Sequence, residues 1–100
     1  MIDKATVYII RSLKTSRLYV GFTTKVVEDR VLEHNDIKFE DAFTKRDRPW
    51  VLYFQIICES EKQARGIEAH IKKMKSKKYI ENLLIYPETV EKLLVKFNTE

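Results

Sequence analysis

Two tyrosines, an arginine, a histidine and a glutamate are the side chains of this sequence best suited to chemistry. Tyr8 and Tyr19 lie eleven residues apart, each in a short run of aromatic and β-branched residues. Arg30 and His34 are four residues apart, which places them on one face of a helix. Glu68 borders an apolar helical stripe, so its carboxylate could face a cleft instead of open solvent. These side-chain types suit the attack of water on a phosphodiester.

That reaction spreads negative charge over the nonbridging oxygens and the leaving oxygen, so it needs cations aimed there and a base for the water. Arg30 has a permanent charge and a planar fork of donors that fits a phosphate. Glu68 could hold one Mg²⁺ ion, which commonly binds through one or two carboxylates and keeps several waters. A tyrosine with its usual pKa of about 10 is a poor base unless nearby cations favour the phenolate. On pKa alone, His34 is therefore a rival base.

Each of these residues also has an ordinary structural explanation. Tyrosines in a hairpin are usually packing residues with wet hydroxyls. Arg30 could pair with Glu33 or Asp29, and His34 could close the C-terminal end of a helix. Glu68 could be one more solvated acid. Only the ordered set of these residues is therefore specific.

The two tyrosines lie in a predicted hairpin. Residues 6–11 (TVYIIR) and 18–22 (LYVGF) are typical of β-strands, and a polar stretch separates them. A turn centred on residues 13–14 would place Tyr8 directly opposite Tyr19, on the same face. A slip of one residue would send one ring to the other face, so the register stays open.

A first helix should follow this hairpin. Thr23 or Thr24 can cap it, and Val27, Val31 and His34 recur at helical spacing, so the helix should run to about His34. An arginine and a histidine on this otherwise apolar face are unexpected unless something anionic or polar lies beside them.

The middle of the chain holds its most apolar run. Residues 50–58 (WVLYFQIIC) predict a strand buried on both faces, although periodicity alone fits a buried helix too. Before it, residues 35–49 mix charges with Phe39 and Phe43 and allow a short helical turn. Cys58 is the single cysteine, so it cannot form an internal disulfide and indicates a buried thiol in a reducing compartment.

Three more helices are predicted. Ser60 and Gln63 have capping-box spacing, and Gly66 inside that helix costs about 1 kcal/mol relative to alanine, which indicates close packing against a neighbour. Residues 79–84 suggest a short helix, and Pro87 suits the first position of the last one. The apolar stripes are Ala64, Ile67, Ile71 and Met74 in the long helix and Val90, Leu93, Leu94 and Phe97 in the last.

The order ββαβααα predicts an α/β fold with a small, mainly antiparallel three-stranded sheet flanked by helices. One hundred residues with 44% hydrophobic content suffice for one domain over residues 1–100 and not for two. No apolar stretch approaches the roughly 20 residues needed to span a bilayer, so we expect a cytoplasmic protein without a membrane partner.

The motifs in this order resemble the GIY-YIG nucleases, especially their small stand-alone members. Residues 6–8 (TVY) and 19–21 (YVG) correspond to the paired signature, with Thr6 in place of its first glycine and Val20 in place of its second isoleucine. The resemblance also includes residues 21–35, 48–53 and 64–73, and it covers roughly 6–85, leaving an extra helix at about 87–98.

This resemblance implies an endonuclease that cuts DNA with one Mg²⁺ or Mn²⁺ ion held by Glu68, in DNA repair or processing. It favours Tyr8 as the base, with Tyr19 and His34 positioning the water, the phosphate or Tyr8. The choice among Tyr8, Tyr19 and His34 stays open. The runner-up is a non-catalytic nucleic-acid-binding domain that keeps the fold, and a third possibility is a protein-interaction module that uses the stripe of the last helix.

Basic residues predict how DNA binds. Nineteen lysines and arginines against fifteen acids give a net charge of +4, a moderate excess that favours polyanions. A lysine run is usually a solvated face, but beside a nuclease signature it predicts a phosphate track without base readout. We expect branched, flapped or damaged DNA as partner; RNA is a further candidate and the oligomeric state is open. The candidate nucleic-acid-binding residues are Lys45, Arg46, Arg48, Lys72, Lys73, Lys75, Lys77 and Lys78.

Overall fold

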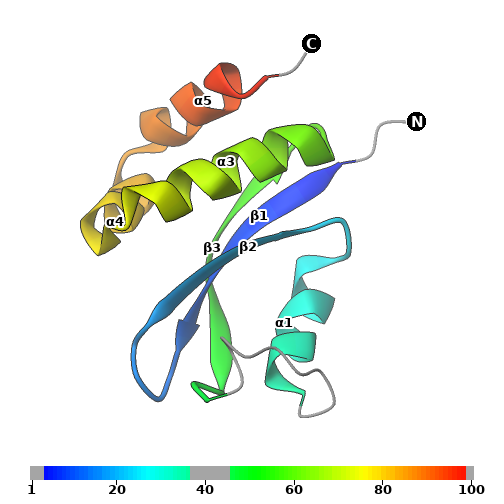
Figure 1. Ribbon diagram of the computed structural model, residues 1–100, viewed down its shortest axis with the longest axis vertical. Coiled ribbons are helices and arrows are strands. Elements are labelled where there is room, and N and C mark those ends of the chain that lie inside the picture. Colours follow the sequence, from blue (N-terminus) through cyan, green and yellow to red (C-terminus); the bar gives the residue numbers. More distant parts are fainter. Residues whose placement is uncertain (1–3, 37–45, 99–100) are drawn as a thin grey trace.

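A computed structural model describes residues 4–36 and 46–98 (Figure 1). Its elements are β1 (Ala5–Ser12), β2 (Leu18–Thr23), α1 (Val27–Asn35), β3 (Trp50–Cys58), α3 (Glu61–Met74), α4 (Lys77–Ile85) and α5 (Pro87–Lys96). The α/β class and the order ββαβααα are therefore confirmed. Phe39, Phe43 and Lys45 lie outside the described residues, so the helical turn and the basic residue predicted there are untested.

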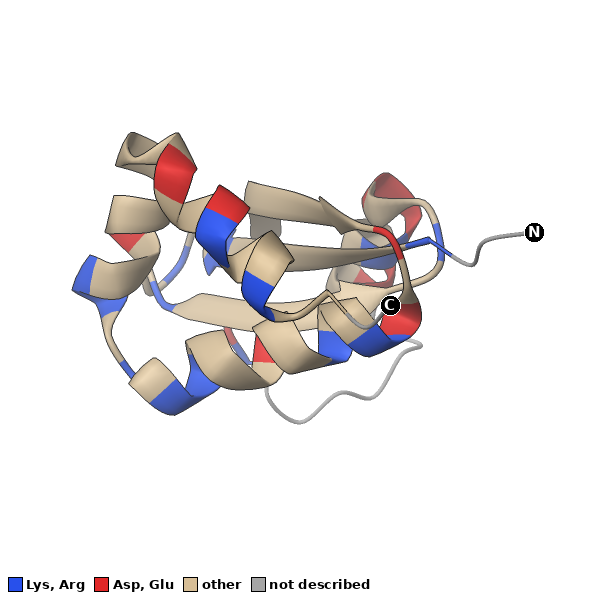
Figure 2. Cartoon of the chain, turned by 90° about the horizontal axis from the view of Figure 1, so that it is seen from above, with Lys and Arg blue, Asp and Glu red and all other residues tan. Residues whose placement is uncertain are grey.

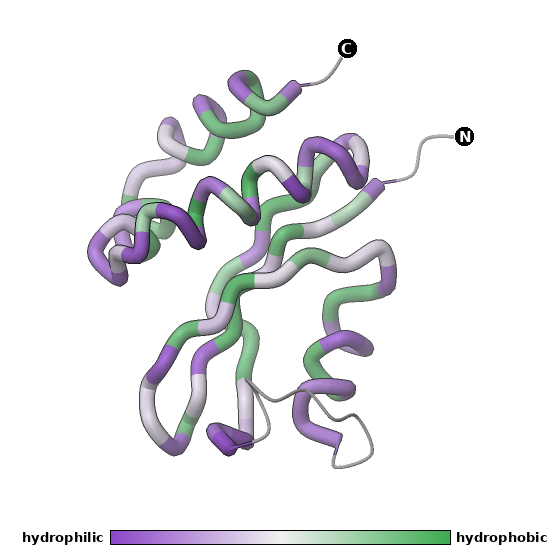
Figure 3. Tube along the Cα trace, in the orientation of Figure 1, coloured by the Kyte–Doolittle hydropathy of each residue, from purple (hydrophilic) through white to green (hydrophobic). Residues whose placement is uncertain are grey.

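The three strands form one antiparallel sheet in the order β2-β1-β3, with helices on both faces. Along the central strand β1, Val7 and Ile9 face α3, whereas Tyr8 and Ile10 face α1. Figure 3 shows hydrophobic and hydrophilic positions alternating along α3, as expected for a helix with one buried side. The sheet thus separates a larger core under α3 from a smaller core under α1.

The hairpin register differs from the predicted one. Tyr8 pairs with Gly21, and Tyr19 pairs with Ile10, so the two tyrosines are not directly opposite each other. The turn is longer than expected because the buried Ser12 hydroxyl accepts hydrogen bonds from two successive backbone N–H groups of the turn, at 3.0 Å each. A shift of two residues keeps every side chain on its face, so Tyr8 and Tyr19 still share the α1 side.

The third strand has the predicted bounds but not the predicted burial. β3 is an edge strand of the sheet, and Ile57 is 64% exposed, with Val51 and Leu52 also exposed. The expectation of a strand buried on both faces was wrong because one face carries little cover among the described residues. Cys58 is a buried free thiol, as predicted.

Helix α1 begins without the predicted threonine cap. Val26 occupies the N-cap position and makes no side-chain cap bond, while Thr23 stays in β2 and its hydroxyl accepts from the Lys25 N–H at 3.0 Å. At the other end, the Asn35 amide bonds the Trp50 backbone in both directions, at 2.9 and 2.6 Å. This pair of bonds ties the end of α1 to the start of β3.

Helix α3 begins at the predicted capping pair, with the return bond of the capping box shifted by one residue to Glu59. Gln63 N–H donates to the Ser60 hydroxyl at 3.1 Å, and the Gln63 side chain accepts from Glu59 N–H at 2.7 Å. A Cβ on Gly66 would lie 2.6 Å from the ring of Phe97, which confirms that this glycine permits close packing.

Helix α5 covers α3 with its apolar stripe. Leu93 is buried in the larger core, and Val90, Leu94 and Phe97 pack against it. The proposal that this stripe is a free protein-binding surface was therefore wrong. No helix in the described ranges is long and apolar enough to cross a membrane.

Candidate active site

Tyr8 is the centre of the candidate site. It lies in the middle of β1, is 1% exposed, and its hydroxyl is 2.8 Å from Nε2 of His34 in α1. At 2% exposure, His34 is equally buried. A buried imidazole that bonds a tyrosine hydroxyl is neither a solvated residue nor a simple helix cap. The pair joins the central strand to α1 and supplies a short path for a proton.

Gly21 makes room for the Tyr8 ring. A Cβ at Gly21 would lie 2.6 Å from the Tyr8 hydroxyl oxygen and 2.7 Å from its Cζ atom, so the ring crosses directly over the β2 backbone. Neither Gly21 nor Gly66 has a positive φ. Glycine is therefore needed at position 21 because a Cβ would not fit beside Tyr8, and not because of its backbone conformation. The sequence contained this signal as the glycine two residues after Tyr19, but its role depends on the register that only the fold shows.

The electrostatic surroundings of Tyr8 bring four of the candidate residues together. Burial raises the pKa of Tyr8 to about 12, and the charges of Tyr19 and Glu68 add to this, whereas the Arg30 guanidinium lowers it by its charge and by a hydrogen bond. Tyr8 therefore carries its proton at neutral pH in the free protein. Arg30 and Glu68 both lie within electrostatic reach of the same hydroxyl.

Tyr19 also contacts the His34 ring. Their ring centroids are 5.3 Å apart in an edge-on arrangement, and the Tyr19 ring also lies 6.4 Å from Trp50. Tyr19 is half-buried, so it is more accessible than Tyr8. The imidazole of His34 thus contacts both tyrosines.

Glu33 anchors the arginine. The Arg30 side chain is 26% exposed and donates to Glu33 at 3.0 Å, while Lys25 donates to the same carboxylate at 2.6 Å. Hydrogen bonding from Lys25 is the largest cause that lowers the Glu33 pKa, with further lowering by Arg30. The ordinary ion pair considered for Arg30 does exist, but the guanidinium also acts on Tyr8. Sequence reasoning missed Glu33 as a positioning residue, although its i,i+3 spacing from Arg30 was visible.

Glu68 reaches the site from the opposite face of the sheet. α3 and α1 lie on different faces of the sheet, and β2 is an edge strand. Glu68 still acts electrostatically on the Tyr8 hydroxyl. The Glu68 side chain is 18% exposed and pairs with Lys72 at 3.3 Å, and Lys72 Nζ lies 5.6 Å from the Tyr19 ring centroid. The structure therefore brings Glu68 to the group through Lys72 and Tyr19, not by direct contact with Arg30.

A divalent ion would have few protein ligands here. In residues 4–36 and 46–98, no group of three or more His, Cys, Asp or Glu side chains is placed to hold a metal. One partly buried carboxylate still fits Mg²⁺, which keeps several waters and binds substrate phosphate. Glu68 is the candidate ligand, and its partner Lys72 shows that it already attracts a cation.

The basic candidates lie at two places. The first place is where α3 ends and α4 begins, with the exposed residues Lys72, Lys73, Lys75, Lys77 and Lys78. Figure 2 colours the lysine and arginine positions of the chain blue. Lys75 has a left-handed backbone conformation, with φ of 48°, and ends α3. The second place is the segment before β3, where Arg46 is exposed and Arg48 half-buried.

Comparison with known proteins identifies the family. Residues 4–80 match the family model for the GIY-YIG catalytic domain. The chain belongs to the GIY-YIG family. The match confirms the resemblance seen in the sequence and ends inside α4, so α5 lies beyond the GIY-YIG region. Neither a curated protein nor a solved structure matches the chain significantly.

The buried state of Tyr8 predicts its alkaline titration. Because its pKa is raised to about 12, Tyr8 should ionise well above the usual tyrosine pKa of about 10 when phenolate absorbance is followed with pH. A raised pKa gives stability that is fully present below the unfolded value of about 10 and is lost as pH rises towards 12. Tyr8→Phe should remove the step near pH 12 from the titration. Tyr79→Phe is the control, since burial raises the Tyr79 pKa away from the site.

Proposed function

We propose that this GIY-YIG domain is a metal-dependent endonuclease that hydrolyses DNA phosphodiester bonds with dependence on DNA structure and little on sequence. DNA repair or processing is the proposed setting. The observation that carries the proposal is the buried Tyr8–His34 hydrogen bond within reach of the charges of Arg30 and Glu68. Catalytic sites often combine a perturbed pKa with neighbouring charges of opposite sign.

In the proposed reaction, Arg30 binds the nonbridging oxygens of the scissile phosphate through its fork of donors. Water attacks phosphorus while the bond to the leaving oxygen breaks. The water proton passes to the Tyr8 oxygen and the Tyr8 proton passes to His34 Nε2, which lies 2.8 Å away. The high pKa of Tyr8 makes this transfer necessary, because a free phenolate is scarce at neutral pH. Tyr19, the less buried tyrosine, positions the water or the phosphate.

Glu68 is proposed to hold one Mg²⁺ or Mn²⁺ ion. When bound, the ion supplies positive charge to the phosphate and leaving oxygens. Lys72 now neutralises this carboxylate and would have to release it. Lys72 is exposed, so this release costs little.

The direct test is cleavage by the purified protein. Supercoiled plasmid, branched DNA and RNA are incubated with Mg²⁺, with Mn²⁺ or with EDTA. We expect metal-dependent cleavage, fastest on branched DNA, and none in EDTA. Metal-independent binding without cleavage of any substrate would favour instead the non-catalytic nucleic-acid-binding domain.

The lysines between α3 and α4 predict a phosphate track. Replacing Lys77 and Lys78 by Gln and Lys75 by Asn, which tolerates a left-handed backbone, should weaken DNA binding equally across sequences. The slope of log K against log salt should flatten by up to about 0.9 per lost contact on duplex DNA. The melting temperature should hardly change, because exposed charges contribute little stability. Binding is measured on inactive Glu68→Ala protein at several salt concentrations.

A matched triple variant removes the same charge elsewhere. Lys4, Lys62 and Lys92 are exposed and lie away from this track, so replacing all three by Gln should change the salt slope less. Equal slopes of log K against log salt for the two triple variants would contradict a phosphate track between α3 and α4. DNA phosphates would then be bound at Arg46 and Arg48 or outside this domain.

A further inference from the structure

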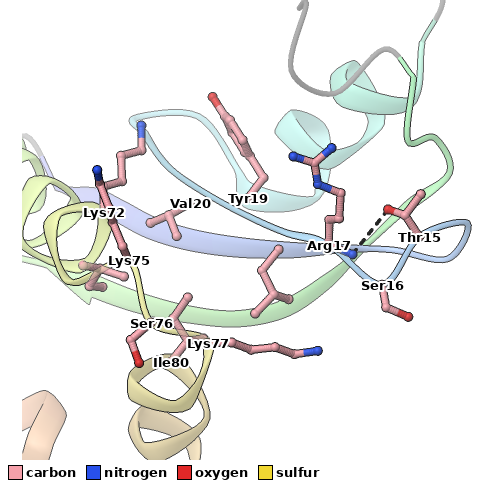
Figure 4. A pocket seen from close by; sticks show the side chains of 12 residues that line it. Thr15, Ser16, Arg17, Tyr19, Val20, Lys72, Lys75, Ser76, Lys77 and Ile80 are labelled. Atoms are coloured by element: carbon pink, nitrogen blue, oxygen red, sulfur yellow. Dashed lines mark hydrogen bonds between the residues drawn. The ribbon is translucent and has the colours of Figure 1, made fainter.

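A groove of about 870 Å³ lies between the β1–β2 hairpin and the junction of α3 with α4 (Figure 4). Its apolar floor consists of Leu18 and Val20 from β2, Ile71 from α3 and Ile80 from α4. Val20, Ile71 and Ile80 belong to the larger core, so the floor is part of a rigid structure. The volume is in the usual range for ligand sites, roughly 300–1,000 Å³.

The rim of this hairpin–α4 groove is cationic. Arg17, Lys72, Lys75 and Lys77 line it, all are exposed, and no acidic residue lies among its described lining residues. The salt bridge of Arg17 to Asp47, at 3.5 Å, joins an arginine side chain that is 74% exposed with a largely buried carboxylate, so most of the Arg17 side chain stays open to a ligand. An apolar floor under a cationic rim fits a ligand that is both anionic and flat-faced.

The groove leads to the candidate active site. Tyr19 and Lys72 line the groove, and both belong to the group around Glu68. Figure 4 shows Tyr19 extending from the opposite face of β2 to Val20, so the groove and the Tyr8–His34 pair lie on two sides of one edge strand. A nucleic acid strand that lies in the groove would therefore pass the edge where Glu68 and Tyr19 meet.

We infer that the hairpin–α4 groove binds an unpaired nucleotide strand next to the scissile phosphate, an inference that rests on the proposed nuclease function. In a duplex the bases are stacked inside and the exposed backbone offers nothing to an aliphatic floor. An unpaired strand offers both the negative charge and the flat apolar face that the groove fits. Its phosphates can pair with the cationic rim while a splayed base covers the apolar floor. The substrate class is then flapped or forked DNA with a single-stranded arm, in preference to fully paired DNA.

Binding in EDTA tests this inference without cleavage. The fluorescence anisotropy of the wild-type protein is measured with an oligothymidine, an abasic oligomer of the same length and charge, and a duplex of that length. We expect the oligothymidine to bind about tenfold more tightly than the abasic strand, because a base that covers the aliphatic floor removes apolar surface from water. It should also bind more tightly than the duplex.

A pair of charge-matched variants locates the site. Arg17→Gln/Lys77→Gln removes two rim charges, and Lys62→Gln/Lys92→Gln removes two exposed charges elsewhere. The rim variant should lose at least about fivefold in affinity for the oligothymidine and less for the duplex, so the ratio of the two affinities falls. The control variant should leave that ratio unchanged.

Equal binding of the base-bearing and abasic strands, or equal ratios for the two double variants, would overturn the inference. These results are separate from those for the proposed function. Metal-dependent cleavage without any preference for binding the unpaired strand would support the proposed nuclease function and contradict the proposed role of the groove. A preference for binding the unpaired strand without cleavage of any DNA would support the proposed role of the groove and contradict the proposed nuclease function.

Discussion

Glu68→Gln protein should lose metal-dependent cleavage by at least about 100-fold while it binds DNA in EDTA nearly as tightly as the parent. Glutamine keeps the size of the side chain but not the charge that would hold a divalent ion. The basic residues that should bind DNA are untouched, and loss of one partly exposed ion pair with Lys72 costs little stability. Cleavage time courses, binding in EDTA and thermal melting measure the three effects.

Two variants show whether Glu68 acts through the metal. Lys72→Gln breaks the same 3.3 Å ion pair but keeps the carboxylate, so it should cleave within about tenfold of the parent. Glu91→Gln removes an exposed acid of α5 and should change nothing. Parent-like cleavage by Glu68→Gln would remove Glu68 from the mechanism. An equal loss in Lys72→Gln would show that the ion pair, not a metal ion, is what matters.

Gly21→Ala should both destabilise the protein and abolish the geometry of the site. The new methyl group would lie 2.6 Å from the Tyr8 hydroxyl oxygen, and that ring is held in the core under α1 with Trp50 and Val27. Overpacking of this kind costs about 1–3 kcal/mol. We expect the displaced Tyr8 to lose its bond to His34, to titrate nearer the usual tyrosine pKa and to support little cleavage.

Gly66→Ala is the matched control for this substitution. Its methyl group would lie equally close, 2.6 Å, to the Phe97 ring, which packs against the larger core and not against the smaller core that holds Tyr8. Denaturant unfolding should show a loss of stability in both variants. Only Gly21→Ala should also lose cleavage per folded molecule and the late tyrosine titration. Full activity of Gly21→Ala would mean that catalysis does not need Tyr8 at its present position.

The sequence alone predicted the elements of this fold and most of their ends. The capping box at Ser60 and Gln63, the helix start at Pro87 and the apolar stripes depend on residues within one or two turns of each other. Such local interactions are visible in sequence. The order of strands and helices followed from them, and so did the α/β class.

The hairpin register was not predictable in this way. It depends on the Ser12 hydroxyl, which accepts from two turn N–H groups and donates to the Asp47 carbonyl oxygen far along the chain. The burial of β3 depended likewise on which strand lies at the sheet edge. Each of these features is set by partners that are distant in sequence.

The candidate site also combines features that the sequence predicted with features that only the fold determines. Residue types, their order and the resemblance to the GIY-YIG family together predicted Tyr8, Tyr19, Arg30, His34 and Glu68 as a candidate set. Only the tertiary structure decided that Tyr8 is buried over Gly21 and protonated, and that Glu68 joins the group round the edge of β2. The physical reason is that the pKa of a side chain and the space around it are set by desolvation and packing between distant segments, which no local pattern records.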